Sequence, residues 1–298
     1  MTDYPYMLAL AGLKGLSPEK KARVALSERA QQAEDTASLK RAIVEVDPLL
    51  LVTTTEIGRA YDHARALCED HLAKGVGISA IWDSDYPTLL REIPDPPLLL
   101  YYLGDISVLN RFPCVAVVGT REPTDYGLEM ANAAGEVLAR AGFTVVSGLA
   151  RGCDTSAHKG SISGRGKTVA FVAHGLQTVY PPENAELATD IVETGGCVAT
   201  EYPLGSKLHP AHFKRRNRLQ TGTSLATLVI ESDLQSGTMY TAGFAQLHKR
   251  KLLVLDHPDD KRSASSEGNL RLLAQGYALA LSEDHIFGLD GVIDGLVG

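Results

Sequence analysis

Residues 114–121 read Cys-Val-Ala-Val-Val-Gly-Thr-Arg, a short apolar run that ends in a glycine. Five further apolar runs follow, at 143–146, 168–172, 198–200, 225–230 and 252–255. Segments with the composition of helices separate them, at 128–141, 155–162, 183–193 and 240–248. Strands that are apolar without alternation are covered on both faces, and strands joined through helices run parallel. The sequence therefore predicts an α/β fold, a Rossmann-like domain with a doubly wound, mostly parallel sheet.

The residues before this pattern divide into two segments. Residues 1–75 are rich in Ala, Leu, Glu and Arg and carry a helix start at Ser17-Pro18, which predicts a small helical domain. Residues 76–112 contain short apolar runs at 77–82 and 98–103, separated by the proline cluster at 94–97. We expect this second segment to be a connector that adds a strand or two to a sheet edge, and the Rossmann-like domain to take residues 113–298.

Composition limits the class of protein. The 298 residues are 44% hydrophobic, enough for a large core, and no stretch approaches the roughly 20 apolar residues of a membrane span. The chain has 29 Lys and Arg against 36 Asp and Glu, so a site for a polyanion must be local. The four cysteines form no CxxC pair, which favours reduced thiols in a cytoplasmic protein over disulfides or a metal site. We expect neither a signal peptide nor a membrane segment.

Three loops that follow predicted strands combine glycine with a hydroxyl or a guanidinium. They are Gly119-Thr120-Arg121, Ser147-Gly148 with Arg151, and Ser236-Gly237-Thr238. In an open parallel sheet these loops share one edge with helix N-termini, a position that suits phosphate oxygens. A tight turn explains any one loop equally well, but three on one edge favour binding. The GxGxxG and P-loop patterns are absent after the first run, so we expect no dinucleotide cofactor and no ATP hydrolysis.

Residues 207–218 form a basic segment without a carboxylate in an otherwise acidic chain. The candidate residues in it are Phe213, Lys214, Arg215, Arg216, Asn217 and Arg218. Cations neutralise backbone phosphates and an aromatic ring stacks on an unpaired base, so this composition is typical of a single-strand groove. A solvated helix face is the alternative from composition alone. The position after the fourth predicted strand of the Rossmann-like domain favours the groove.

Ordered motifs along most of the chain resemble the DprA family, also called Smf. They include Asp85-Tyr86-Pro87, Val118-Gly119-Thr120-Arg121, Ser147-Gly148-Leu149-Ala150-Arg151-Gly152-Cys153-Asp154, Tyr180-Pro181-Pro182-Glu183-Asn184, Phe213-Lys214-Arg215-Arg216-Asn217-Arg218 and Ser236-Gly237-Thr238. The resemblance implies an extended Rossmann domain preceded by a small helical domain of the SAM or helix-hairpin-helix kind. It also implies a homodimer without a cofactor that protects incoming single-stranded DNA and loads a RecA-type recombinase in natural transformation.

The resemblance assigns the DNA pocket to the residues of the three loops and of the basic segment. They are Gly119, Thr120, Arg121, Ser147, Gly148, Arg151, Phe213, Lys214, Arg215, Arg216, Asn217, Arg218, Ser236, Gly237 and Thr238. Arg121, Lys214 and Arg216 would contact phosphates and Phe213 would stack, while Asn217 could instead bond backbone between loops. On this basis charge reversal at both Arg121 and Arg216 is expected to abolish DNA binding and leave the thermal melt intact.

Two other functions remain open. One is a DprA-like nucleotide or DNA sensor, or antitoxin, of a defence module. The other is a nucleotide phosphoribohydrolase of the related LOG type, but the equivalent turn at 236–241 has threonine where the catalytic glutamate of that type would stand. Cleavage of an N-glycosidic bond then lacks the carboxylate that stabilises its transition state, so we expect a protein that is not an enzyme.

Overall fold

The structure, a computed structural model, describes residues 5–289 and 291–293. Within these residues a nine-stranded sheet runs in the order β1-β2-β6-β5-β4-β3-β7-β8-β9. The strands are β1 (Gly77–Ala80), β2 (Leu99–Gly104), β3 (Cys114–Val118), β4 (Thr144–Ser147), β5 (Thr168–Phe171), β6 (Cys197–Thr200), β7 (Ala226–Val229), β8 (Lys251–Leu255) and β9 (Leu279–Leu281). The strands from β6 to β9 in this order pair in parallel, which confirms the predicted α/β fold with a mostly parallel sheet.

The strand predictions fail only at the β9 end of the sheet. All six apolar runs from 115 onward form strands, and the two runs at 77–82 and 98–103 form β1 and β2. These two pair antiparallel with each other, and β2 pairs antiparallel with β6, so both extend one edge of the sheet. The sequence did not predict β9, because this three-residue strand exposes two of its residues and lacks a buried apolar run.

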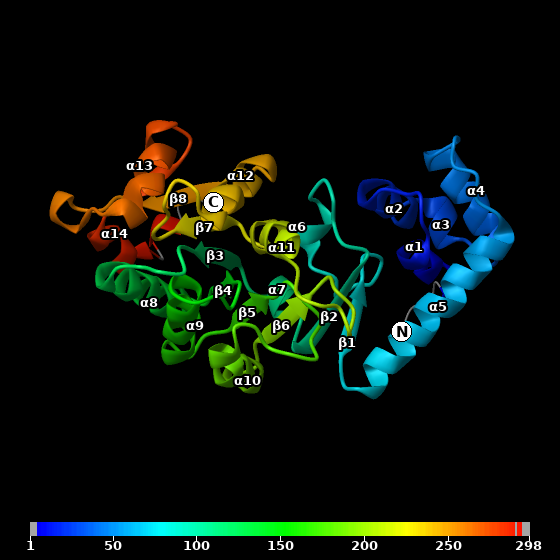
Figure 1. The fold of residues 1–298 in the computed structure, drawn as a ribbon, viewed down its shortest axis with the longest axis horizontal. Helices are drawn as coiled ribbons and strands as arrows, with labels where there is room; N and C mark the ends of the chain where they lie inside the picture. The colour runs from blue at the N-terminus through cyan, green and yellow to red at the C-terminus, as the bar shows by residue number, and fades with distance from the viewer. Residues whose placement is uncertain (1–4, 290, 294–298) are drawn as a thin grey trace.

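Helices cover both faces of the sheet (Figure 1). One face packs against α8 (Asp125–Arg140), α9 (Cys153–Ser163) and α14 (Glu283–Phe287) through a cluster that includes Val115 and Leu253. Further along this face, α10 (Ala185–Glu193) covers β5 and β6. The other face packs against α12 (Gly237–Leu247) and α13 (Glu267–Ala274) through Val118, Val229 and Val254. Burial on both faces explains why these strands are apolar without alternation.

The N-terminal helices lie beyond the β1 edge of the sheet (Figure 1). They are η1 (Pro5–Leu8), α1 (Ala9–Gly12), α2 (Pro18–Ala25), α3 (Glu28–Gln31), α4 (Thr36–Val46) and α5 (Thr54–Ala73). Ser17 caps α2 as the helix start predicts, accepting a hydrogen bond from Lys20 N. One hydrophobic cluster joins these helices to the sheet, from Leu10 and Leu39 to Leu100 and Cys197. The division into domains at residues 75 and 112 stays a prediction.

The chain order creates a crevice at the carboxyl end of β3. β3 lies between β4 and β7, because the chain first builds the sheet toward β6 and later returns to build it from β7 toward β9. Such a reversal leaves the adjoining loops apart, and ligands of open α/β sheets bind there. The segments that reach this crevice are the loop after β3, α11 (Pro210–Gly222) and the start of α12.

Candidate functional site

A pocket of about 650 Å³ occupies this crevice. Most of the predicted site residues line it: Gly119, Thr120, Arg121, Phe213, Lys214, Arg216, Asn217, Ser236, Gly237 and Thr238. A smaller cavity beside it is lined by Gly148 and Arg151 together with Arg121 and Phe213. The structure therefore brings the three loops and the first half of α11 together around one concave surface.

Arg121 and Phe213 form the wall shared by the pocket and the smaller cavity. The guanidinium carbon of Arg121 lies 4.8 Å from the centroid of the Phe213 ring, a cation–π contact between the β3 loop and α11. Arg121 is exposed, so its charge remains available to a ligand. The preceding Thr120 hydroxyl accepts a hydrogen bond from Glu122 N, which fixes the turn that carries Arg121.

Arg216 places a buried positive charge at the base of the pocket. Only 4% of it is exposed, and its guanidinium donates to Gly148 O at 2.6 Å and to Phe171 O. Burial lowers the pKa of Arg216 to about 10, so the side chain remains cationic at neutral pH. Gly148 allows this contact, because a Cβ there would lie 2.4 Å from the guanidinium. We therefore expect a charge reversal at Arg216 to destabilise the fold, in place of the intact thermal melt that the sequence alone suggested.

Asp154, in the first turn of α9, lies near the charge of Arg216. Its carboxylate accepts hydrogen bonds from Gly148 N at 3.1 Å and Ala150 N at 3.3 Å, which fixes the loop after β4. Burial raises the pKa of Asp154, and the nearby Arg216 charge opposes that rise. The predicted site residue Ser147 is also buried, and its hydroxyl donates to Val117 O at 2.7 Å. Ser147 thus ties β4 to β3 and does not line either cavity.

Asn217 joins α11 to α12. Its Nδ2 donates to Gly237 O at 3.2 Å, and its Oδ1 accepts from Arg216 Nε at 3.2 Å. At the start of α12, Ser236 Oγ accepts from Thr238 N at 2.9 Å. A Cβ at Gly237 would meet no atom within 4 Å, so this helix start faces open space. An open helix N-terminus beside cations is a site for an anion.

Three predicted cations are held by carboxylates. Arg218 is buried and binds Glu201 and Asp95, and Arg215 binds Glu201 at 3.2 Å; neither lines the pocket. Arg151 lines the smaller cavity and is paired with Glu183, but both side chains are about half exposed. Such an exposed pair contributes little to stability and can reopen for a ligand.

Sequence reasoning missed Tyr240, which lines the pocket from α12. Its signal is helical spacing, since it stands four residues after the cap Ser236. The Nζ of Lys214 lies 3.8 Å from the centroid of the Tyr240 ring.

Glu231 is fully buried near the crevice. It accepts from Thr124 N at 2.8 Å and Thr124 Oγ1 at 2.5 Å, and lies 3.3 Å from His257 Nε2. Glu231 thus anchors the cap of α8.

Among residues 5–289 and 291–293, no three His, Cys, Asp or Glu side chains are grouped closely enough to hold a metal ion. In the same part of the chain, every helix is too short or too polar to cross a membrane.

Comparisons with known proteins agree with the resemblance. Residues 77–288 match the family described as DNA recombination-mediator protein A. The chain is 39% identical over 228 residues to Protein Smf of Synechocystis sp., covering 76% of this chain and 56% of that relative. It is 32% identical over 232 residues to the DNA processing protein DprA of Bacillus subtilis, covering 78% and 77%. The chain thus spans little more than half of the Synechocystis relative.

Two solved structures share the fold. The X-ray structure of DprA from Streptococcus pneumoniae superposes with a TM-score of 0.78 at 27% identity, over 99% of both chains. A structure of DNA processing protein A from Helicobacter pylori, described for its single-stranded DNA binding mode, gives a TM-score of 0.65 at 28% identity. That match covers 74% of this chain and 96% of the other.

Proposed function

The chain belongs to the DNA recombination-mediator protein A family, and from this premise we propose that it binds single-stranded DNA in the pocket between β3, α11 and α12. The convergence of cations carries the proposal. Arg121 from the loop after β3 meets Lys214 and Arg216 from α11 in one pocket of an otherwise acidic protein. Cations around a concave surface with aromatic rings are what an unpaired strand requires.

The resemblance to the family supports a finer role as well. We propose that the protein protects incoming single-stranded DNA in the cytoplasm, acts as a homodimer and loads a RecA-type recombinase. Two pockets on one particle would increase the avidity for a long flexible strand without stronger individual contacts. The single-stranded DNA binding mode described for the Helicobacter pylori relative supports this substrate.

We propose a binding role rather than a catalytic one. Glu231 and Glu201, which follow β7 and β6, are both occupied: Glu231 is held by Thr124 and His257, and Glu201 by Arg218 and Arg215. A general acid or base needs a carboxyl group free to exchange a proton with a substrate. Incubation with AMP, followed by chromatography for free adenine, tests the alternative phosphoribohydrolase activity, and released adenine would contradict the binding role.

Titration of labelled oligonucleotides tests the proposed function. We expect the full chain to bind a single strand more tightly than a duplex of the same length. Raising the salt from about 50 to about 200 mM should weaken binding steeply, with a slope of roughly −0.7 for each phosphate contacted. Equal affinity for both forms, or no binding at low salt, would contradict the assignment.

A further inference from the structure

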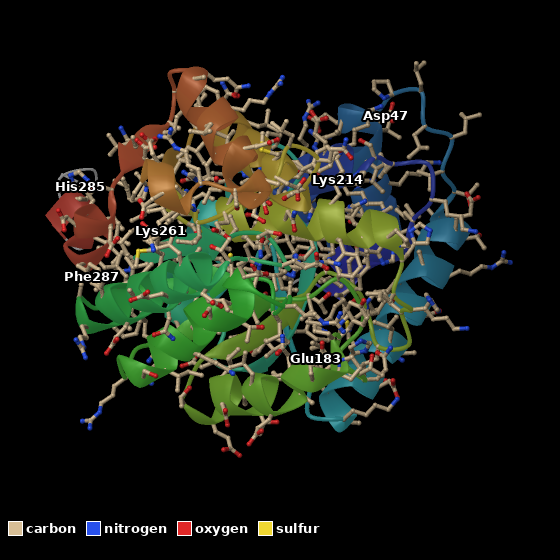
Figure 2. The ribbon with its side chains drawn as sticks, turned by 60° about the vertical axis from the view of Figure 1, so that its left-hand side comes forward. Asp47, Glu183, Lys214, Lys261, His285 and Phe287 are labelled. Carbon is tan, nitrogen blue, oxygen red and sulfur yellow. The ribbon has the colours of Figure 1, made fainter. Side chains whose placement is uncertain are left out.

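Lys214 and Tyr240 form a second cation–aromatic pair in the pocket. The Nζ of Lys214, on α11, lies 3.8 Å from the ring centroid of Tyr240, on α12. Figure 2 shows Lys214 on the yellow-green α11. Among the described residues no carboxylate forms an ion pair with Lys214, whereas Arg215 and Arg218 both pair with Glu201. The Lys214 charge is therefore not neutralised by a direct partner.

The α-helical period explains why α11 contributes one residue to each of two cation–aromatic pairs. Consecutive residues on a helix point roughly 100° apart, so Phe213 and Lys214 reach different neighbours. Phe213 contacts Arg121 in the loop after β3, whereas Lys214 contacts Tyr240 on α12. The pocket consequently has one cation–aromatic pair beside β3 and another beside α12.

Tyr240 stands beside the open start of α12. Residues three apart on a helix share a face, so Tyr240 lies on the same side of α12 as Gly237. Both residues line the pocket, and Gly237 leaves open space there. Despite the contact with Lys214, 51% of Tyr240 remains exposed. An exposed ring beside an anion site can stack on the base whose phosphate occupies that site.

We propose that Tyr240 stacks on an unpaired base of the strand whose phosphate Lys214 binds, as a nucleotide contact separate from the Arg121–Phe213 wall. This inference rests on the proposed function. It assigns base stacking to Tyr240 and phosphate binding to Lys214. Replacing Tyr240 should lower the affinity only for strands that carry bases, and should leave the salt dependence of binding unchanged. Replacing Lys214 should lower the affinity equally for strands with and without bases, because it removes a contact to the backbone charge.

The experiment compares two ligands of equal length, oligothymidylate and an abasic strand with the same sugar–phosphate backbone. Tyr240→Leu should weaken binding of oligothymidylate by roughly five-fold or more and leave the abasic strand unchanged. Tyr240→Phe keeps the ring and should restore the preference for oligothymidylate. Lys214→Gln should weaken both ligands by the same factor and reduce the salt slope by roughly 0.7.

A matched control is Phe287→Leu, which removes a ring of similar exposure, 53%, from α14. It should bind both ligands like the parent protein. Equal weakening of both ligands by Tyr240→Leu, or of neither, would overturn the stacking role. An unchanged salt slope for Lys214→Gln would overturn the phosphate role. If the parent protein binds neither ligand, the proposed function itself fails, a result distinct from these.

Discussion

Arg218 and Glu201 form a bidentate ion pair, with Nη1 2.9 Å from Oε1 and Nη2 2.8 Å from Oε2. Arg218 is 1% exposed, and the side chain of Glu201 is 7% exposed. The Nε of Arg218 also donates to Asp95 Oδ2 at 2.8 Å, in the proline-rich stretch before β2. Arg218 thus ties α11 to the end of β6 and to the connector, and its charge is satisfied inside the protein.

We expect Arg218→Leu to lower the free energy of unfolding by roughly 3–5 kcal/mol, because it leaves the Glu201 carboxylate buried without its main partner. Urea unfolding monitored by circular dichroism measures this loss. The matched control is Arg215→Leu, which removes an exposed guanidinium from the same carboxylate and should cost about 1 kcal/mol or less. Equal losses in the two variants would show that Arg218 is not the structural member of the pair.

The basic segment illustrates how far the sequence predicts the site. Its composition correctly predicts a cationic segment at the edge where the parallel strands end, because that edge is fixed by topology. Composition does not reveal which cations are already paired. The partners of Arg218 stand 17 and 123 residues away, so only the folded chain shows that Arg218 faces Glu201 and Asp95 and Lys214 faces the pocket.

The fold, like the site, could be predicted from the sequence only in part. Buried apolar runs predict β3 to β8, since a strand covered on both faces has no polar alternation. The run at 279–281 is mostly exposed and too short to stand out, so β9 was missed. The extent of the pocket was also missed on its α12 side, because a single tyrosine in a helical segment is equally consistent with packing.

Arg121→Gln should weaken binding of single-stranded DNA by roughly ten-fold and leave the melting temperature unchanged. Arg121 is exposed, and its contact is with the Phe213 ring, so its loss removes a phosphate contact and little packing. Fluorescence anisotropy and a thermal melt measure the two effects. Arg41→Gln, an exposed arginine on the distant α4, serves as the control and should change neither. A lower melting temperature for Arg121→Gln, or unchanged affinity, would contradict its place as a surface phosphate contact.

Acid should destabilise the protein in a defined pH range. Burial lowers the pKa of His158 to about 3 and the pKa of His248 to about 4, from an ordinary value of 6.5. The unfolded chain therefore binds more protons below pH 6.5, and stability present above that pH is lost as the pH falls toward these lower values. We expect a loss of roughly 1 kcal/mol for each histidine between pH 7.5 and 5.5, measured by urea unfolding.

The variant His248→Gln separates the contribution of this histidine to the pH dependence of stability from the contribution of the carboxylates. The glutamine side chain of this variant does not titrate, so the part of the pH-dependent loss that comes from His248, roughly 1 kcal/mol, should disappear, while the parts from His158 and from His174, whose pKa burial also lowers, remain. Burial raises the pKa of Glu231, but hydrogen bonds from His257 and Thr124 outweigh it and lower the net pKa below the ordinary 4.5. The contribution of Glu231 is therefore lost only at more acidic pH. A loss in His248→Gln as large as in the parent protein would rule out His248 as a source.

Gly237→Ala tests whether a ligand approaches the start of α12. A Cβ at Gly237 would meet nothing within 4 Å and would project into the pocket, so the fold should keep or slightly increase its stability while DNA binding weakens. Gly243→Ala is the matched control, because its Cβ also meets nothing within 4 Å but lies further along the same helix. It should gain up to about 1 kcal/mol of stability from helix propensity and bind DNA like the parent protein. Thermal melts and anisotropy titrations compare the two. If Gly237→Ala binds as tightly as Gly243→Ala, no phosphate lies close to the N-terminus of α12, and the strand must follow the Arg121 side of the pocket instead.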